Sequence, residues 1–204
     1  MTETITYDED EIEAFKELGN VGAGHAAIAL SKLFSREVGM SIPFVRVQKI
    51  KEIIEELELK DGDKIGNVFV EVTNPIKYRL SVIFKEQVIV DLLNILTSSS
   101  RKVIGDEGLS EMHSSLIQEV GSIILLRYIA ALNKMLSVES MPDIAPKFEY
   151  IPAMSSLSQL VYSEDDNIML IQLDLFTEGE KFECNMFIHP NPEDRQTYRD
   201  AFLL

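Results

Sequence analysis

ELGNVGAGHAAIALSKLF, residues 17–34, recurs 102 positions later as EVGSIILLRYIAALNKML, residues 119–136, and this repeat decides the fold. Identical residues meet without a gap at five positions: Glu17 with Glu119, Gly19 with Gly121, Ala29 with Ala131, Leu30 with Leu132 and Lys32 with Lys134. The apolar residues of both copies recur at helical spacing. The sequence therefore predicts one long helix over residues 8–34, with a capping box formed by Thr6 and Glu9, and a second over residues 115–136.

Similar elements are predicted after each of these helices. Two strand-like runs and a closing helix follow in each copy: residues 68–72, 79–84 and 86–96 in the first, and residues 168–176, 181–189 and 193–202 in the second. The strand-like runs alternate apolar and polar residues, which is typical of half-buried antiparallel strands. A break rich in serine and charge, residues 98–108, separates the two copies.

Two such copies predict a single α+β domain over residues 1–204, built from halves at residues 8–97 and 109–204 that are related by a pseudo-twofold axis. The two long helices would pack on one face of a shared, mostly antiparallel sheet. Independent folding of each half is disfavoured, because one hairpin would leave an exposed sheet edge. Residues 52–63 are strongly charged and are predicted to form a solvated helix and loop.

Composition narrows the class of partner. The chain of 204 residues carries a formal net charge of −15, which argues against nucleic acid and anionic membranes, since both need clustered Lys and Arg. The N-terminal residues lack the basic and apolar segments of a signal peptide, and no apolar run reaches the roughly 18 residues of a membrane span. A single cysteine, Cys184, excludes an internal disulfide and fits a reducing cytoplasm. We expect a cytoplasmic protein.

A polar and glycine-rich patch lies inside the first predicted helix. Glu17 and Asn20 are three residues apart, so they project from the same face of a helix. Gly19, Gly22 and Gly24 surround them, and each glycine inside a helix costs roughly 1 kcal/mol relative to alanine. Close crossing of the two long helices would explain Gly19, which recurs in the second copy. It explains Gly22 and Gly24 poorly, because both are replaced by large residues there.

This pattern, with 22 residues between Asn20 and Pro43, resembles the CheC, CheX and FliY family of chemotaxis phosphatases, most closely the CheC type. The family pattern places Asp or Ser four residues before the glutamate. Glu13 holds that position here, which keeps the polarity but not the usual residue. The resemblance covers the whole chain.

The second copy keeps only part of the pattern. Ser115 and Glu119 match it, but Ser122 stands where the amide is expected. Ile124 and Leu126 replace Gly22 and Gly24, and Pro146 comes one residue late. The second site is therefore predicted to be degenerate and inactive.

The resemblance implies a phosphatase that hydrolyses the aspartyl phosphate of the response regulator CheY. Asn20 would position the attacking water, as a glutamine does in GTPases, and Glu17 would pair with a lysine of the regulator. Glu13, Gly22, Gly24 and Pro43 would contact the regulator. The regulator would supply Mg²⁺, so the chain needs no cofactor of its own.

Other interpretations of the same residues stay open. A solvated helix face explains Glu17 and Asn20 from periodicity alone. A non-catalytic module that binds phosphorylated CheY, or an adaptor between chemotaxis and the motor, would need only the intact half-motif, and a purely structural motor protein would leave Asn20 unexplained. His25 adjoins the motif, but no nucleophile with a partner is apparent and a role at the rim is favoured.

The sequence gives little support for further ligands or partners. The histidines show no metal-ligand spacing with Cys184, so no metal site is predicted. The family often binds CheD, through a short helix that carries an Asp. The corresponding residues 150–154 contain none, so CheD binding is in doubt. Since both halves lie in one chain, a monomer is expected.

Overall fold

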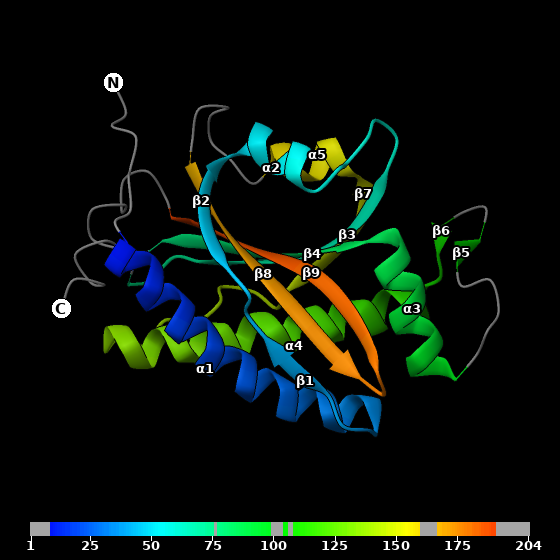
Figure 1. Cartoon of the computed structure of the whole chain (residues 1–204), viewed down its shortest axis with the longest axis horizontal. Coiled ribbons are helices and arrows are strands. Elements are labelled where there is room, and N and C mark those ends of the chain that lie inside the picture. Colours follow the sequence, from blue (N-terminus) through cyan, green and yellow to red (C-terminus); the bar gives the residue numbers. More distant parts are fainter. Residues whose placement is uncertain (1–8, 76, 99–103, 106–107, 160–166, 191–204) are drawn as a thin grey trace.

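The computed structural model describes residues 9–75, 77–98, 104–105, 108–159 and 167–190. The elements in chain order are α1 (Glu9–Phe34), β1 (Gly39–Ser41), β2 (Val45–Lys49), α2 (Ile50–Glu56), β3 (Lys64–Val72), β4 (Tyr78–Lys85), α3 (Glu86–Thr97), β5 (Ile104–Gly105), β6 (Gly108–Leu109), α4 (Glu111–Leu136), β7 (Lys147–Pro152), α5 (Ala153–Ser158), β8 (Asn167–Thr177) and β9 (Glu180–Pro190). They form a sheet with helices on both faces (Figure 1).

One antiparallel sheet holds seven of the strands. Its order is β1-β8-β9-β4-β3-β7, and β2 continues beside β8 next to β1. The two long hairpins, β3–β4 and β8–β9, meet at the centre, where Val82 pairs with Met186 and Leu80 with Ile188. The short strands β5 and β6 form a separate ribbon. The predicted α+β fold with a shared, mostly antiparallel sheet is confirmed.

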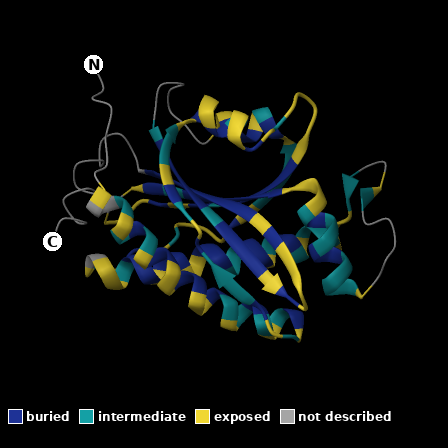
Figure 2. Cartoon of the chain, in the orientation of Figure 1, coloured by how far each residue is buried: buried dark blue, intermediate teal, exposed yellow. Residues whose placement is uncertain are grey.

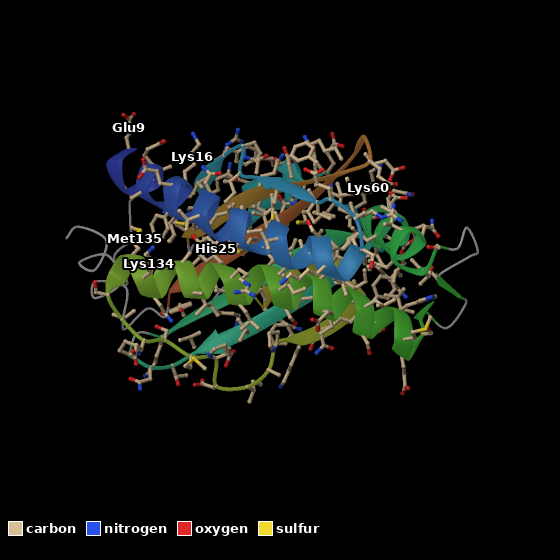
Figure 3. All side chains as sticks on the ribbon, turned by 90° about the horizontal axis from the view of Figure 1, so that it is seen from below. Glu9, Lys16, His25, Lys60, Lys134 and Met135 are labelled. Atoms are coloured by element: carbon tan, nitrogen blue, oxygen red, sulfur yellow. The ribbon has the colours of Figure 1, made fainter. Side chains whose placement is uncertain are left out.

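The long helices α1 and α4 lie side by side and antiparallel on one face of the sheet, with α3 beside them (Figures 1 and 3). Side chains from these helices and from that face of the sheet form the main core, and Phe15, Leu30, Phe84 and Leu93 are fully buried within it. Burial of this apolar stripe, rather than helix propensity, accounts for a glycine-containing α1.

The repeat extends to the bounds and ends of the helices. The described part of α1 and the whole of α4 each have 26 residues, and α4 ends 102 residues after α1. Ser35 and Ser137, also 102 residues apart, follow the two helices with positive φ angles of 54° and 52°. These matching ends confirm the predicted internal repeat.

A side-chain hydrogen bond is also repeated, although the residue that makes it differs. The Ser31 hydroxyl accepts from the backbone N–H of Val38 at 2.9 Å. In the second half the Asn133 side chain accepts from the backbone N–H of Ser140 at 3.0 Å, with the same 102-residue offset. Each bond holds the chain that leaves a long helix as it turns toward the sheet.

The second face of the sheet is covered more than the sequence predicts. The short helices α2 and α5 lie over it, and Figure 2 shows buried strand residues beneath them. Ile53 of α2, Leu157 of α5 and Phe187 of β9 belong to a separate core cluster on this side. The prediction of half-buried strands is wrong for β3, β4 and β8, which are mostly buried along their length, and for residues 184–189 of β9. The solvated segment predicted at residues 52–63 likewise contributes the buried Ile53.

Among the described residues, α4 is the single helix whose length and apolar composition would allow it to cross a membrane. Of its most apolar window, 56% is buried within the fold. Gly121 of α4 packs against Val68 of β3, as expected of a helix in the core. Its apolar character therefore has an explanation in the fold itself.

Three predicted features lie outside the described residues: Thr6 of the capping box, the first residue of the helix predicted to start at Asp8, and the helix predicted over residues 193–202. The predicted break at residues 98–108 is described only in part and contains β5 and the start of β6.

Candidate active site

Polar and small residues form one exposed stripe along α1. Glu13, Glu17, Asn20, Gly24 and Ile28 are exposed and follow one another at spacings of four, three, four and four residues. Such spacings place them on the same side of a helix. The opposite side of α1 is buried in the main core, so packing of the helix on the sheet fixes this stripe outward.

The central pair of the stripe has no partner within the described part of the chain. Glu17 and Asn20 make no hydrogen bond or ion pair there, whereas Glu13 lies 3.7 Å from the Lys16 ammonium. An exposed carboxylate and an exposed carboxamide one turn apart keep their full hydrogen-bonding capacity for an external molecule. The stripe can therefore bind and orient groups that approach from outside the protein.

The three glycines of the patch have different environments. A β-carbon at Gly19 would overlap the end of the Ile42 side chain, just as one at Gly121 would overlap Val68. Both therefore serve packing of a long helix on the sheet side, and not a crossing of the two helices. The helix crossing is made by Gly22, where a β-carbon would come within 3.3 Å of the Tyr128 Cα in α4.

This geometry corrects one expectation for Gly22. Packing of α1 on α4 explains this residue, although its counterpart Ile124 is large, so no external partner is needed to account for it. Gly24 differs, because a β-carbon there would have no neighbour within 4 Å. Packing within the described fold therefore does not explain the glycine at position 24, which lies on the exposed stripe.

Pro43 is exposed between β1 and β2. It directly follows Ile42, whose side chain packs against Gly19. Gly19 lies between Glu17 and Asn20 in the sequence. The fold thus ties the proline of the motif to the helical segment that carries the polar pair.

The second copy presents a different surface on α4. Ser115 and Glu119 are exposed, Ser122 is half-buried, and Leu126 is 41% exposed at the position that matches Gly24. Pro146 is buried, and its carbonyl accepts a hydrogen bond of 2.8 Å from the Gln118 side chain. The second copy therefore lacks the amide, the open glycine and the exposed proline of the first.

Five hollows in the described part of the surface lie away from the stripe. An open hollow of about 700 Å³ is lined by residues that include Asp91, Glu178 and Lys181. A second, of about 520 Å³, includes Ser115 and Lys64. Neither includes Glu17 or Asn20, so the polar pair stands on an exposed helix and is suited to enter a cleft of another molecule.

Other reactive groups give no alternative site. Burial raises the pKa of the Cys184 thiol well above its usual range, so this cysteine is no nucleophile at neutral pH. Within the described ranges no group of three His, Cys, Asp or Glu residues is placed to hold a metal ion. His25 is exposed beside the seam between α1 and α4 (Figure 3).

Sequence reasoning missed the apolar part of this surface. Val21 and Ile28 of α1 are 48% and 63% exposed, on the same outer side as the polar pair. Ile28 continues the spacing that links Glu13, Glu17, Asn20 and Gly24, and this continuation is visible in the sequence. It was overlooked because an isoleucine in a long helix is usually part of the core.

No family model matches the chain. It is 22% identical over 191 residues to the CheY-P phosphatase CheC of Bacillus subtilis (strain 168), a match that covers 90% of this chain and 89% of the relative. The crystal structure of Thermotoga maritima FliY has a TM-score of 0.77 with 17% identity, covering 98% of both chains. A chain of the FliG–FliM complex from H. pylori has a TM-score of 0.65 with 14% identity, covering 90% of this chain and 94% of that one. The sequence match spans nine-tenths of the chain and the fold is shared with FliY, so the predicted resemblance to the CheC, CheX and FliY family is confirmed.

Proposed function

We propose that this protein is a phosphatase that hydrolyses the aspartyl phosphate of a CheY-type response regulator. The observation that carries the proposal is the exposed pair of Glu17 and Asn20, which has no partner within the described chain. Its setting, in a chain similar to a CheY-P phosphatase over nine-tenths of its length, supports the same conclusion.

An acyl phosphate is already activated, so catalysis consists mainly of placing a water in line with the phosphorus. The Asn20 carboxamide orients that water by hydrogen bonding and needs no change of ionisation. Attack of the water on phosphorus breaks the bond to the aspartyl oxygen. Inorganic phosphate leaves, and the regulator's aspartate returns to a free carboxylate.

Glu17 gives the docking its direction. Its carboxylate pairs with a lysine in the regulator's active site, in a charge-assisted contact that fixes α1 in the cleft. The regulator supplies the Mg²⁺ that neutralises the phosphoryl oxygens. The chain itself contributes position and hydrogen bonds, and we expect it to act without a cofactor.

Gly24 provides clearance one turn beyond Asn20. Because it is exposed and has open space around it, a partner surface can approach the helix backbone at this level. Glu13 and Pro43 border the same region and would contact the regulator at its edges. Leu126 fills the equivalent space in the second copy, which together with Ser122 leaves that copy without activity.

The competing function is a binding module that captures the phosphorylated regulator or links it to another protein without turnover. Two observations favour it: only one half-motif is intact, and the fold is shared with a chain of the FliG–FliM complex. In either function we expect a cytoplasmic monomer, and binding of CheD is disfavoured because residues 150–154 carry no Asp.

One experiment distinguishes the two functions. Purified protein is mixed at a substoichiometric amount with phosphorylated regulator and Mg²⁺, and release of inorganic phosphate is followed against regulator alone. Phosphate in excess of one equivalent per molecule of this protein supports the phosphatase. Saturable binding with no acceleration over the regulator's own hydrolysis contradicts it and supports the binding module.

A further inference from the structure

Arg127 is unusual among the described arginines because it has no partner. The other three bind carboxylates: Arg36 contacts Glu178 at 2.7 Å, Arg46 contacts Glu56 at 2.6 Å, and Arg79 contacts Glu71. Arg127 is exposed on α4 and makes no hydrogen bond or ion pair with any described residue. In a chain with a net charge of −15, an unpaired guanidinium stands out.

The position of Arg127 connects it to the stripe on α1. It directly precedes Tyr128, whose Cα lies against Gly22 at the crossing of α1 and α4. Gly22 lies between Asn20 and Gly24, so Arg127 stands level with this part of α1. It is also on the outer side of the helix layer, because it is exposed whereas Tyr128 is buried.

Exposed apolar side chains lie on the same two helices. Leu126 of α4 is 41% exposed, and Val21 and Ile28 of α1 are 48% and 63% exposed. We call these four residues, Val21, Ile28, Leu126 and Arg127, the bridging patch, because they come from both long helices. Apolar side chains beside an arginine are the composition of energetically important interface residues.

We infer that the bridging patch is a second docking contact for the phosphorylated response regulator, in which Arg127 binds the acidic rim of the regulator's active site. The inference rests on the proposed function for the identity of the partner. A site that holds an aspartyl phosphate and the carboxylates for its Mg²⁺ is strongly anionic at its edge. An unpaired guanidinium beside the inserted helix complements that charge and can bind a carboxylate or phosphoryl group in a bidentate manner.

Continuity with the polar pair supports the same occupant. The open space at Gly24 lies between Asn20 and Ile28 along α1, so a surface that approaches Gly24 also reaches Val21 and Ile28 on the same helix. Val21 follows Asn20 directly. Binding at the patch thus orients the regulator across both helices, while Glu17 and Asn20 act within its active site.

The test measures affinity separately from turnover. The regulator is loaded with Mg²⁺ and beryllofluoride, a stable mimic of the phosphoryl group, and its Kd is measured for wild type and for Arg127→Gln. We expect Kd to rise roughly tenfold at an ionic strength of about 0.05 M, and the difference to shrink at about 0.5 M because salt screens the contact. Arg127→Lys should restore part of the affinity.

A matched control removes the same charge elsewhere. Lys60 is exposed and follows α2 on the other side of the sheet, so Lys60→Gln should leave Kd unchanged. Because Arg127 makes no hydrogen bond or ion pair with any described residue, its substitution should not alter the thermal unfolding midpoint. In turnover assays, Arg127→Gln should raise KM and leave kcat unchanged, a division that a catalytic or purely structural role would not give.

Failure of this inference can be told apart from failure of the proposed function. Equal Kd values for wild type and Arg127→Gln at low salt overturn the role of Arg127, whether or not the wild type shows turnover. A wild type that binds the loaded regulator through Arg127, yet releases no phosphate, overturns the phosphatase and supports the docking patch.

Discussion

Gly22 of α1 lies directly against Tyr128 of α4, so close that a β-carbon on Gly22 would stand 3.3 Å from the Tyr128 Cα and 3.5 Å from its ring. The contact joins the backbone of α1 at Gly22 to Tyr128, an aromatic residue that is buried in the core. Neither can move aside easily. A β-carbon at Gly24, only two residues away, would have no neighbour within 4 Å. Gly22 is therefore required for packing of the two helices, whereas Gly24 is not.

We predict opposite stability effects at these two positions. Gly24→Ala should raise the free energy of unfolding by roughly 1 kcal/mol, because alanine is the better helix former and finds open space. Gly22→Ala gains the same propensity but forces α1 and α4 apart, so it should lower the free energy of unfolding by about 1 kcal/mol or more. Urea unfolding of both variants checks this, and two variants of equal stability would contradict the assignment of Gly22 to packing.

A larger residue at Gly24 should separate stability from activity. Gly24→Leu copies the residue of the second copy, Leu126, and should leave the fold at least as stable as wild type. If partner clearance is the role of Gly24, kcat/KM for phosphate release should fall roughly 10²-fold, because a small misplacement of the reacting groups is costly. Full activity in this variant would show that the partner never approaches the helix here.

Asn20 and Ser122 occupy equivalent positions in the two copies and give a matched pair of variants. Asn20→Ala should lower kcat roughly 10²-fold or more, by analogy with the loss of one positioned hydrogen-bond donor. Ser122→Ala should leave kcat unchanged, since the second copy lacks the amide. Both positions are on the outer sides of their helices, so thermal unfolding should be little affected. Equal losses from the two variants would mean that both copies work.

Gly19 and Gly121 occupy equivalent positions in the two copies, but their substitution should lower the free energy of unfolding by different amounts. A β-carbon at Gly121 meets the Cβ and both methyl groups of Val68, a branched side chain that cannot turn away. At Gly19 it meets mainly the terminal carbon of Ile42, which can rotate. We therefore expect Gly121→Ala to destabilise by about 2 kcal/mol and Gly19→Ala by clearly less, as measured by urea unfolding.

The repeat made most of the fold predictable. Matching helices and hairpins at a 102-residue offset predict one sheet under two long helices, because periodicity reports which side of each element is buried. A helix is predicted within residues 52–63, but the packing of α2 and α5 on the sheet is not, and this has a physical reason. Ile50 and Ile53 lie among charged residues in a segment too short for periodicity to identify, and only their contact with the sheet explains their burial.

The glycines show how far the candidate site could be predicted from the sequence. Comparison of the copies correctly assigned Gly19 to the fold, because Gly121 repeats it. It could not show that Gly22 packs on Tyr128, because Ile124 replaces Gly22 in the second copy. Loss of a glycine in the repeat therefore does not by itself indicate function. Open space, as at Gly24, is the better criterion and needs coordinates.

We predict that the free energy of unfolding falls at alkaline pH, because folding buries Tyr78. Burial raises the pKa of Tyr78 from its ordinary value of 10.0 to about 12, an effect that a hydrogen bond with Ser140 partly offsets. The neutral phenol is thus favoured in the folded state, and its contribution to stability is fully present below pH 10. Between about pH 10 and pH 12 the unfolded chain loses the proton while the folded chain keeps it, so the free energy of unfolding falls as pH rises.

Two other buried groups shift in the same direction, because burial also raises the pKa of Tyr128 and of Cys184. Tyr78→Phe removes one of these ionisable groups and should flatten the decline by on the order of 2 kcal/mol between pH 9 and pH 12. Urea unfolding at several pH values measures the slope for each protein. An identical slope for wild type and Tyr78→Phe would mean that Tyr78 ionises as readily in the folded chain as in the unfolded one, and that water reaches its hydroxyl despite the packing around it.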